Sequence, residues 1–490
     1  MPVRAAPVQY VKICSLYGDG FYYIRGTDIC LKIGGYVRGE YAYNAGRSMT
    51  NGAFEGGSPR NGSGYKDRFD GQDFTMRTRA YALFDSRQLT EYGTLRSYLQ
   101  IGVNYDSPRN TNTNFSANRA FIQFAGFTVG SGQSFFDFFS SSAVAYFDLL
   151  ASDRIRGTKV FAYTAQYGNG LSATFSFEEP RSMGRATPTS GVINTNLGNG
   201  GLVLGTIALD PDRAKARFPD IVQNWLVDQA WGSAQLMVAA HDVSGGYYAA
   251  NAQALGGPLA GCVSGTANGV TTGSEVCGHP ADKVGWAVGG GSWFNLYQGD
   301  YFQWQVTYAQ GATRYVNHTQ GFSPVQFNGS NFGYGLLSDG VFSVATGDVQ
   351  LTTVWGVNAA YDHFWLSNFR TSIYGAWTRY EYGDSANLAI CTAQTAFAVG
   401  AVTFTPAQVA AGACNNNFSW WQLGSRTQYN FTPWFYVGFD VIYSKIQSAS
   451  NGTVAFFTPP AGVAKPATFY AIQDQDNYAF RIRVHRDIVP

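Results

Sequence analysis

Apolar and polar residues alternate strictly along the stretch 478–487, near the end of the chain. Successive side chains of a β-strand point to opposite sides, so this pattern predicts a strand with one apolar face and one cationic face. A soluble sheet would turn the apolar face inward, whereas a membrane barrel would turn it outward to lipid and leave the arginines around a wet lumen. This stretch alone leaves both arrangements open. The two registers are Tyr478, Phe480, Ile482 and Val484, against Ala479, Arg481, Arg483 and His485.

The same period of two recurs along the chain and predicts sixteen strands, which is an even number. Many of these segments are longer than the five or six residues typical of strands in globular sheets. The predicted strands are 31–44, 74–87, 94–105, 118–125, 127–133, 158–167, 171–178, 218–229, 233–243, 283–297, 301–310, 348–363, 369–382, 417–429, 435–446 and 477–487.

The connections between these segments alternate between short turns and long Gly/Asn/Ser-rich loops. This alternation predicts an all-β fold: an antiparallel up-and-down barrel of sixteen strands, with short periplasmic turns and long extracellular loops. A soluble sandwich has no reason to place every long connection at one end. Eleven residues at about 3.3 Å each, tilted by about 40°, also rise about 25 to 28 Å, which matches a hydrocarbon core. The long loops are 45–72, 106–117, 134–157, 179–217, 244–282, 311–347, 383–416 and 447–476.

Composition agrees with a membrane barrel. Charged residues make up 13% of the 490 residues and aromatics 16%, with 58 glycines, so charge is low and disorder is disfavoured. No apolar run approaches the ~18 residues of a spanning helix. The net charge of +1 argues against a nucleic-acid partner. Aromatics beside the short turns predict a girdle at the headgroup level: Tyr92, Phe127, Trp231, Tyr301, Phe364, Trp365, Phe431 and Trp434.

Arginines recur on the polar register of strands from both ends of the chain, and these ends meet when a barrel closes. A lipid-facing arginine at the midplane costs about 2 to 4 kcal/mol, so we expect these side chains to line the lumen as a permanently positive wall. A solvated face of a soluble sheet is the alternative. The expected pore-lining arginines are Arg38, Arg77, Arg79, Arg96, Arg426, Arg481 and Arg483.

The third long loop, 134–157, is more apolar than the others and carries Asp137, Asp148 and Asp153. A loop this apolar is unsuited to bulk water, so we expect it to fold into the barrel and narrow the channel. Its carboxylates would then face the arginines and create a transverse field across the constriction. A lipid contact or a subunit contact are the alternatives for this loop.

The six cysteines fall into pairs that are close in sequence and contain no CxxC spacing. This pattern predicts three local disulfides in an oxidising compartment, with free buried cysteines as the alternative. Five scattered histidines give no metal-binding spacing, and no catalytic motif is present, so we expect neither an enzyme nor a cofactor. The cysteine pairs are Cys14 with Cys30, Cys262 with Cys277, and Cys391 with Cys414.

The segment 8–43, VQYVKICSLYGDGFYYIRGTDICLKIGGYVRGEYAY, resembles the amino-terminal signature of the alphaproteobacterial porins, the family of the major outer-membrane porins of Brucella and Rhizobium relatives. The paired cysteines, GFYYI, GTD and LKIGGYVR carry the resemblance, and GFTVGSGQSFFD at 126–137 is similar to the family's approach to the constriction loop. Arg25 departs from the family's usual proline, and RDIVP departs from the terminal aromatic common among outer-membrane barrels. The first residues lack a signal-peptide pattern, so for an exported protein we expect a mature form.

The resemblance implies a homotrimer in the bacterial outer membrane, with lipid, lipopolysaccharide and small hydrophilic solutes as partners. We expect an N-terminal segment 1–30 with a local disulfide, then a barrel over 31–490. The expected function is passive diffusion of ions and small hydrophilic solutes. The alternative is a channel selective for one class of small polar or anionic solute; an outer-membrane hydrolase and a secreted adhesin are weaker alternatives.

Overall fold

A computed structural model describes the greater part of the chain. The described residues are 13–43, 64–65, 74–107, 114–153, 157–181, 191–195, 216–246, 266–267, 270–271, 279–318, 324–342, 346–395, 402–457 and 466–489.

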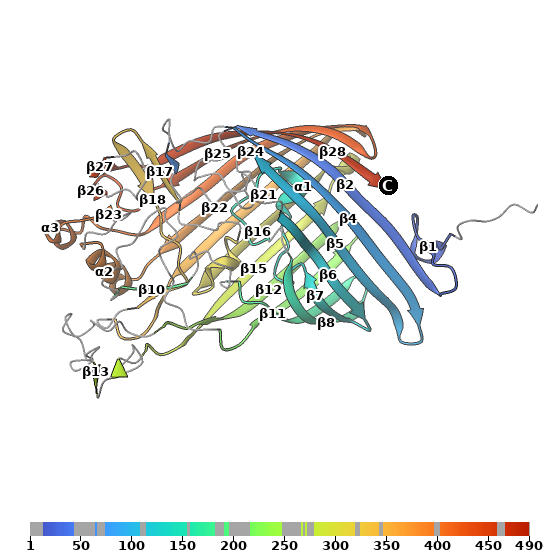
Figure 1. Cartoon of the computed structure of the whole chain (residues 1–490), viewed down its shortest axis with the longest axis horizontal. Helices are drawn as coiled ribbons and strands as arrows, with labels where there is room; N and C mark the ends of the chain where they lie inside the picture. The colour runs from blue at the N-terminus through green and yellow to red at the C-terminus, as the bar shows by residue number, and fades with distance from the viewer. Residues whose placement is uncertain are drawn as a thin grey trace, which may run out of the picture.

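Within these residues, sixteen antiparallel strands form a closed barrel (Figure 1). Each strand pairs with the next along the chain, and the last strand pairs with the first, so the sheet has no free edge. The strands are β2 (Ile29–Tyr43), β4 (Phe74–Thr90), β5 (Gly93–Ser107), β6 (Asn114–Phe124), β7 (Phe127–Gly132), β8 (Thr158–Gly168), β9 (Leu171–Glu178), β11 (Asp220–Gln229), β12 (Gly232–Val243), β15 (Lys283–Asn295), β16 (Tyr301–Gln310), β21 (Thr353–Leu366), β22 (Phe369–Glu381), β24 (Phe418–Thr432), β25 (Phe435–Gln447) and β28 (Gln475–Val489).

The predicted fold class and all sixteen predicted strands are confirmed. Bounds differ by a few residues in both directions: β4 extends to Thr90 beyond the predicted 87, whereas β21 begins at Thr353, after the predicted 348. The seam between the two ends of the chain pairs Tyr41 with Ile482 and Arg38 with His485, so the first and last strands share a register.

The two faces of β28 are oriented as a membrane barrel requires. The exposed fraction is 47% for Ile482 and 54% for Tyr478, but 4% for Arg481 and 0% for Ala479. The apolar register therefore points away from the barrel, and the cationic register points into it. The alternation, which by itself fitted both a soluble sheet and a membrane barrel, is therefore that of a membrane barrel, with apolar residues outside and polar residues inside.

The short turns gather at the end of the barrel where the C-terminus lies (Figure 1). The turn between β8 and β9 holds Asn169 and Gly170 with φ of 50° and 73°, the left-handed pair of a tight hairpin. A Cβ at Gly170 would overlap the carbonyl oxygen of Asp228, so this turn also needs glycine for close packing. Most of the predicted girdle residues are exposed beside these turns, but Tyr301 is not: it is 8% exposed and hydrogen-bonds Asp362 inside the barrel.

The N-terminal segment is fastened to the turn end of the barrel. The strand β1 (Tyr22–Tyr23) pairs with the start of β2, and the helix η1 (Ser15–Tyr17) precedes it. The predicted disulfide between Cys14 and Cys30 is formed and packs with buried Phe21.

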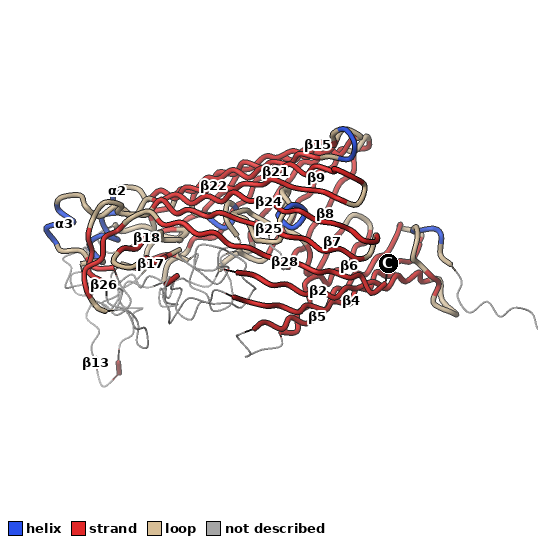
Figure 2. Tube along the Cα trace, turned by 90° about the horizontal axis from the view of Figure 1, so that it is seen from above, coloured by secondary structure: helices blue, strands red, loops and turns tan. Residues whose placement is uncertain are grey.

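The long loops at the opposite end do more than connect strands, because parts of them fold into a layer with its own sheet (Figure 2). The disulfide between Cys391 and Cys414, which was also predicted, joins α2 (Asp384–Ala393) to the segment that follows α3 (Pro406–Ala410). The sequence reading treated these segments as loops and missed the layer. Cys262 and Cys277 lie outside the described residues. The layer contains β3 (Gly64–Tyr65), β17 (Val325–Asn328), β18 (Asn331–Tyr334), β23 (Val402–Thr403), β26 (Val454–Phe457), β27 (Thr468–Ile472), α2 (Asp384–Ala393) and α3 (Pro406–Ala410).

Smaller elements complete the described structure. Among the described residues, no helix is long and apolar enough to cross a membrane. The smaller strands form two sheets: β10 (Val192–Asn194), β19 (Gly340–Phe342) and β20 (Gln350–Leu351) in one, and β13 (Thr266–Ala267) with β14 (Val270–Thr271) in the other. The short helices are α1 (Ser141–Val144), η4 (Tyr297–Gly299) and η5 (Thr313–Tyr315).

The outward register predicts how single charges affect stability. Ile482 lies at the centre of β28, so Ile482→Arg should lower the free energy of unfolding in lipid vesicles by about 2 to 4 kcal/mol. Ile488, near the strand end and 59% exposed, is the matched control, and Ile488→Arg should cost about 0 to 1 kcal/mol. Urea unfolding followed by tryptophan fluorescence measures both values, and equal losses would contradict this placement.

Candidate functional site

The third long loop enters the barrel and packs against its inner wall. Phe136, Phe139, Phe147, Leu149 and Leu150 are each buried to 1% exposure or less. The loop follows β7, the shortest of the sixteen barrel strands, and its four-residue helix α1 lies near β21 and β22. The expected inward fold of this loop is confirmed.

Polar side chains of the wall take over the hydrogen bonds of the loop backbone. The Phe139 N–H donates to Oε1 of Gln305 at 2.9 Å, and the Leu150 N–H donates to Oε1 of Gln422 at 3.0 Å. Asn358 donates to the Leu150 carbonyl at 2.7 Å. An unpaired buried backbone group costs about 1 to 3 kcal/mol, so these amides hold a loop of irregular backbone at barrel depth.

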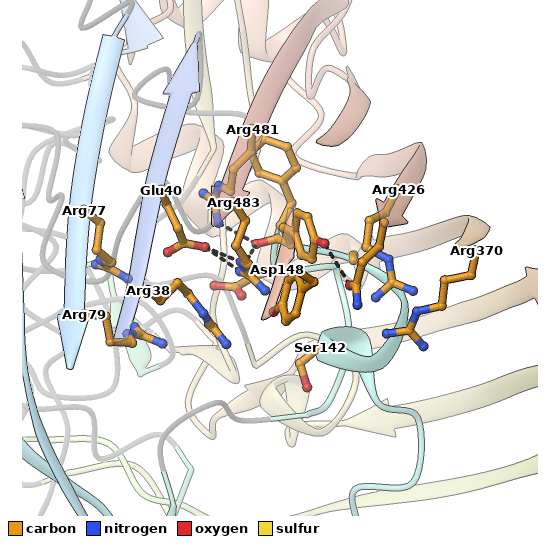
Figure 3. A pocket seen from close by; sticks show the side chains of 15 residues that line it. Arg38, Glu40, Arg77, Arg79, Ser142, Asp148, Arg370, Arg426, Arg481 and Arg483 are labelled. Carbon is orange, nitrogen blue, oxygen red and sulfur yellow. Dashed lines mark hydrogen bonds and ion pairs between the residues drawn. The ribbon is translucent and has the colours of Figure 1, made fainter. Parts of the chain in front are cut away.

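A cavity of about 230 Å³ lies between the loop tip and the wall. The close-up in Figure 3 shows guanidinium groups surrounding it from several strands. Its lining contains seven arginines and two carboxylates, together with Ser142, Ala145, Gln428 and three aromatic rings. The charged residues are Arg38 and Glu40 from β2, Arg77 and Arg79 from β4, Arg370 from β22, Arg426 from β24, Arg481 and Arg483 from β28, and Asp148 from the loop.

Six of the seven arginines predicted from the sequence meet at this cavity. The exception is Arg96, which bonds Asp85 at 2.9 Å and Gln123 at 3.0 Å outside the cavity lining. Sequence reasoning missed Arg370. Its signal was present, because Arg370 shares the inward register of β22 with the buried residues Ser372 and Tyr374.

Arginines on the loop side are held by carboxylates and aromatic rings. Nε of Arg483 donates to Glu40 at 2.7 Å, and its guanidinium lies 4.0 Å from the centre of the Tyr146 ring. Arg426 donates to Asp362 at 2.9 Å and to the Ala143 carbonyl of the loop at 2.7 Å. Charge-assisted bonds of this kind fix the guanidinium planes before any solute arrives.

A second group of arginines lines the wall across β2 and β4. Arg38 and Arg79 are cross-strand partners. Nε of Arg38 donates to Nδ1 of His485 at 3.2 Å, and Nε of Arg79 donates to Oδ1 of Asn104 at 2.6 Å. Each guanidinium also lies within 6 Å of a tyrosine ring, at 4.9 Å from Tyr36 for Arg38 and 5.6 Å from Tyr81 for Arg79.

The structure corrects the expected placement of two loop carboxylates. Asp148 lines the cavity with the arginines, as expected. Asp137 instead pairs with Arg181 at 2.7 Å, and Asp153 accepts bonds from Ser141 at 2.8 and 3.0 Å. Asp153 therefore serves as an acceptor within the loop, and Asp137 connects the loop to the segment after β9.

Arg181 is a buried anchor that sequence reasoning missed. It donates to Oγ of Ser134 at 2.6 Å and to the Ser152 carbonyl at 2.7 Å, in addition to its pair with Asp137. Burial opposes its charge, but the Asp137 carboxylate more than compensates and raises the pKa of Arg181. Arg181 lies just after β9, so the fourth loop braces the third. Nothing in the spacing of the sequence indicates this contact.

Burial also raises the pKa of Asp153 to about 7, and the nearby Asp137 charge adds to the shift, although the bonds from Ser141 oppose it. This carboxyl can therefore change its charge near neutral pH. Among the residues that the structure describes, no three His, Cys, Asp or Glu side chains are grouped so as to hold a metal ion.

Comparison with known proteins identifies the family. The family model described as the porin subfamily matches residues 1–480, which is nearly the whole chain. The chain belongs to the porin subfamily. This porin is accordingly a multi-pass protein of the bacterial outer membrane.

Individual relatives share a shorter segment with this porin. It is 32% identical over 193 residues to porin Omp2a and 31% identical over 183 residues to porin Omp2b, both of Brucella melitensis biotype 1. Each match covers 35% of this chain and 47% or 45% of the relative, so the chain spans about half the length of the curated relatives it matches.

Among solved structures, this porin is similar to the outer membrane channel DcaP of Acinetobacter baumannii. The TM-score is 0.53 at 12% identity, over 95% of this chain and 99% of that chain. At this identity the likeness concerns the fold alone.

The raised pKa of Asp153 predicts that the stability of the folded third loop depends on pH. Its folded-state pKa is raised above the ordinary 3.8, so its contribution to stability is fully present below about pH 4 and is lost as the pH rises through about 7. Amide hydrogen exchange in α1, corrected for intrinsic rates, should be several-fold faster at pH 8 than at pH 5.5. In Asp153→Asn, which stays neutral, the corrected rates should agree at the two pH values. The same pH dependence in both proteins would rule out Asp153 as its source.

Proposed function

We propose that this porin forms a water-filled channel for the passive diffusion of ions and small hydrophilic solutes across the outer membrane. The observation that carries the proposal is the third loop, which is hydrogen-bonded to the inner wall and leaves a charged cavity at its tip. Membership of the porin subfamily supports a channel rather than an enzyme. Transport of this kind needs no bond chemistry, only a wet path of suitable width and charge.

We further propose that the arginines of the cavity line the narrowest part of the path. Seven guanidinium groups against two carboxylates make a positive wall, because arginine stays protonated at any working pH. Such a wall raises the local concentration of anions and disfavours cations. Asp148 is the acidic group that faces this wall from the loop.

Planar bilayers test the channel and its charge. Purified protein should conduct in discrete steps, with a reversal potential in a salt gradient on the anion-selective side. Arg77→Gln combined with Arg79→Gln should move the reversal potential toward cations, because two of the lining charges are lost.

The control for this measurement is Arg96→Gln, which removes an arginine outside the cavity while Arg87 still pairs with Asp85 at 2.8 Å. This variant should shift the reversal potential much less. Silent bilayers from folded protein would contradict the channel, and equal shifts would contradict the position of the constriction.

A homotrimer is the assembly we propose, and the low wall around β7 supports it. The six residues of β7 span about 20 Å when extended and about 15 Å along the membrane normal, less than the apolar band of about 25 Å. Outward residues nearby include Val129, Phe161 and Phe175, each more than 40% exposed in the single chain. A neighbouring subunit would cover this sector, where lipid would meet irregular backbone.

A bulky apolar substitution separates a packed interface from a lipid-facing surface. Val129→Trp on β7 should convert trimers to monomers in detergent, because a tight interface cannot accept the added volume. Ile373→Trp on β22, 58% exposed on the far side of the barrel, should remain trimeric, since lipid accommodates the ring. Light scattering coupled to size exclusion gives both masses. If Val129→Trp remains trimeric, the interface does not lie at β7. If the parent protein is monomeric, the trimer proposal is wrong.

A further inference from the structure

The described lining of the cavity holds seven arginines and two carboxylates. Of its two lining carboxylates, Glu40 is bound to Arg483. Two further carboxylates lie in the wall behind it. Asp362 is shared by Arg370 and Arg426, while Asp440 accepts bonds from the Tyr146 and Phe147 N–H groups and from the Tyr374 hydroxyl. Among the described residues, seven guanidinium groups therefore outnumber these four carboxylates around a space of about 230 Å³.

Two arginines line this space from two strands, β2 and β22, that are separated in the barrel by β28, β25 and β24. Arg38 belongs to β2 and Arg370 to β22, and Figure 3 shows them on either side of the opening, with Ser142 and Asp148 of the loop between them. Within the described residues, Arg38 donates to the His485 ring and forms no ion pair with a carboxylate. Arg370 contacts Asp362 at 3.2 Å, but Arg426 makes the shorter contact at 2.9 Å.

The stiffness of these arginines favours binding over mere attraction. Arg38 lies 4.9 Å from the Tyr36 ring and Arg370 lies 5.6 Å from the Phe364 ring. A guanidinium fixed on an aromatic face loses little conformational entropy when it binds, and its planar fork matches a carboxylate with two parallel hydrogen bonds. Arg483 of the same cavity already binds the Glu40 carboxylate, with Nε and Nη2 both directed at Oε1.

We propose that the cavity is a binding site for small organic anions with two carboxylate groups, one bound near Arg38 and the other near Arg370. This inference rests on the proposed function and names its preferred solute class. A monocarboxylate engages one of the two arginines only, whereas a diacid of matching length engages both. Binding at this site must remain weak enough for release, so the site favours a class of solute without trapping it.

The test measures binding first and conduction second. Calorimetry on the purified protein in detergent, at constant ionic strength, compares acetate with the series from malonate to pimelate. We expect one chain length to bind at least tenfold tighter than acetate, with weaker binding on both sides of that length. In bilayers the same diacid should reduce the chloride current over the same concentration range.

Variants separate the two-point site from general electrostatics. Arg38→Gln and Arg370→Gln should each weaken binding of the best diacid about tenfold and abolish the dependence on its length. Both variants should fold, because no described carboxylate loses its last partner: Arg38 is in ion-pair contact with none of them, and Asp362 keeps Arg426. Arg38→Lys keeps the charge but loses the fork, so it should bind between the parent and Arg38→Gln. Arg96→Gln is the matched control and should stay within twofold of the parent.

Each outcome decides between the proposals. If the porin conducts but binds all diacids no better than acetate, it has no two-point site, while its channel function stands. The same conclusion follows if Arg96→Gln loses as much affinity as Arg38→Gln. Tighter binding of inorganic phosphate than of any diacid would overturn the assigned class. A protein that binds the diacid but never conducts retains the site and contradicts the channel.

Discussion

The structure depends on the absence of water in hydrocarbon, where every backbone N–H and C=O must find a partner within the protein. A closed sheet satisfies them all, and the pairing of β2 with β28 provides that closure. Closure then decides the orientation of every side chain, because a strand with one face on lipid has its other face in the lumen. The arginines lie in the interior of the barrel as a consequence of this geometry.

The third loop solves the same problem by different means. Its backbone is irregular, so it cannot complete its hydrogen bonds by itself at barrel depth. Gln303, Gln305 and Gln422 supply amide groups from the wall, and Arg426 and Arg481 donate to loop carbonyls. The arginines therefore have two roles: they carry the charge of the cavity and they hold the loop that encloses it. Charge and shape at this site cannot change independently.

The sequence predicted what depends on local alternation and missed what depends on distant contacts. Period-two patterns located all sixteen strands and six of the seven cavity arginines, because the register of a strand fixes which face a residue occupies. Arg96 was assigned to the correct, inward face but lies outside the cavity, because alternation does not give the position of a residue along the barrel axis. The pair of Asp137 with Arg181 and the outer sheet join segments far apart along the chain. No periodicity encodes such partners.

The folded outer layer changes what this protein presents to its surroundings. Segments from different loops share one sheet, where β17 pairs with β3 and β18 pairs with β27, and the Cys391–Cys414 disulfide joins α2 to the segment after α3. An antibody or a bacteriophage that approaches the cell therefore meets a composite surface, in which neighbouring residues come from distant parts of the chain. Recognition of this surface requires the intact fold. Short peptides copied from single loops would reproduce little of it.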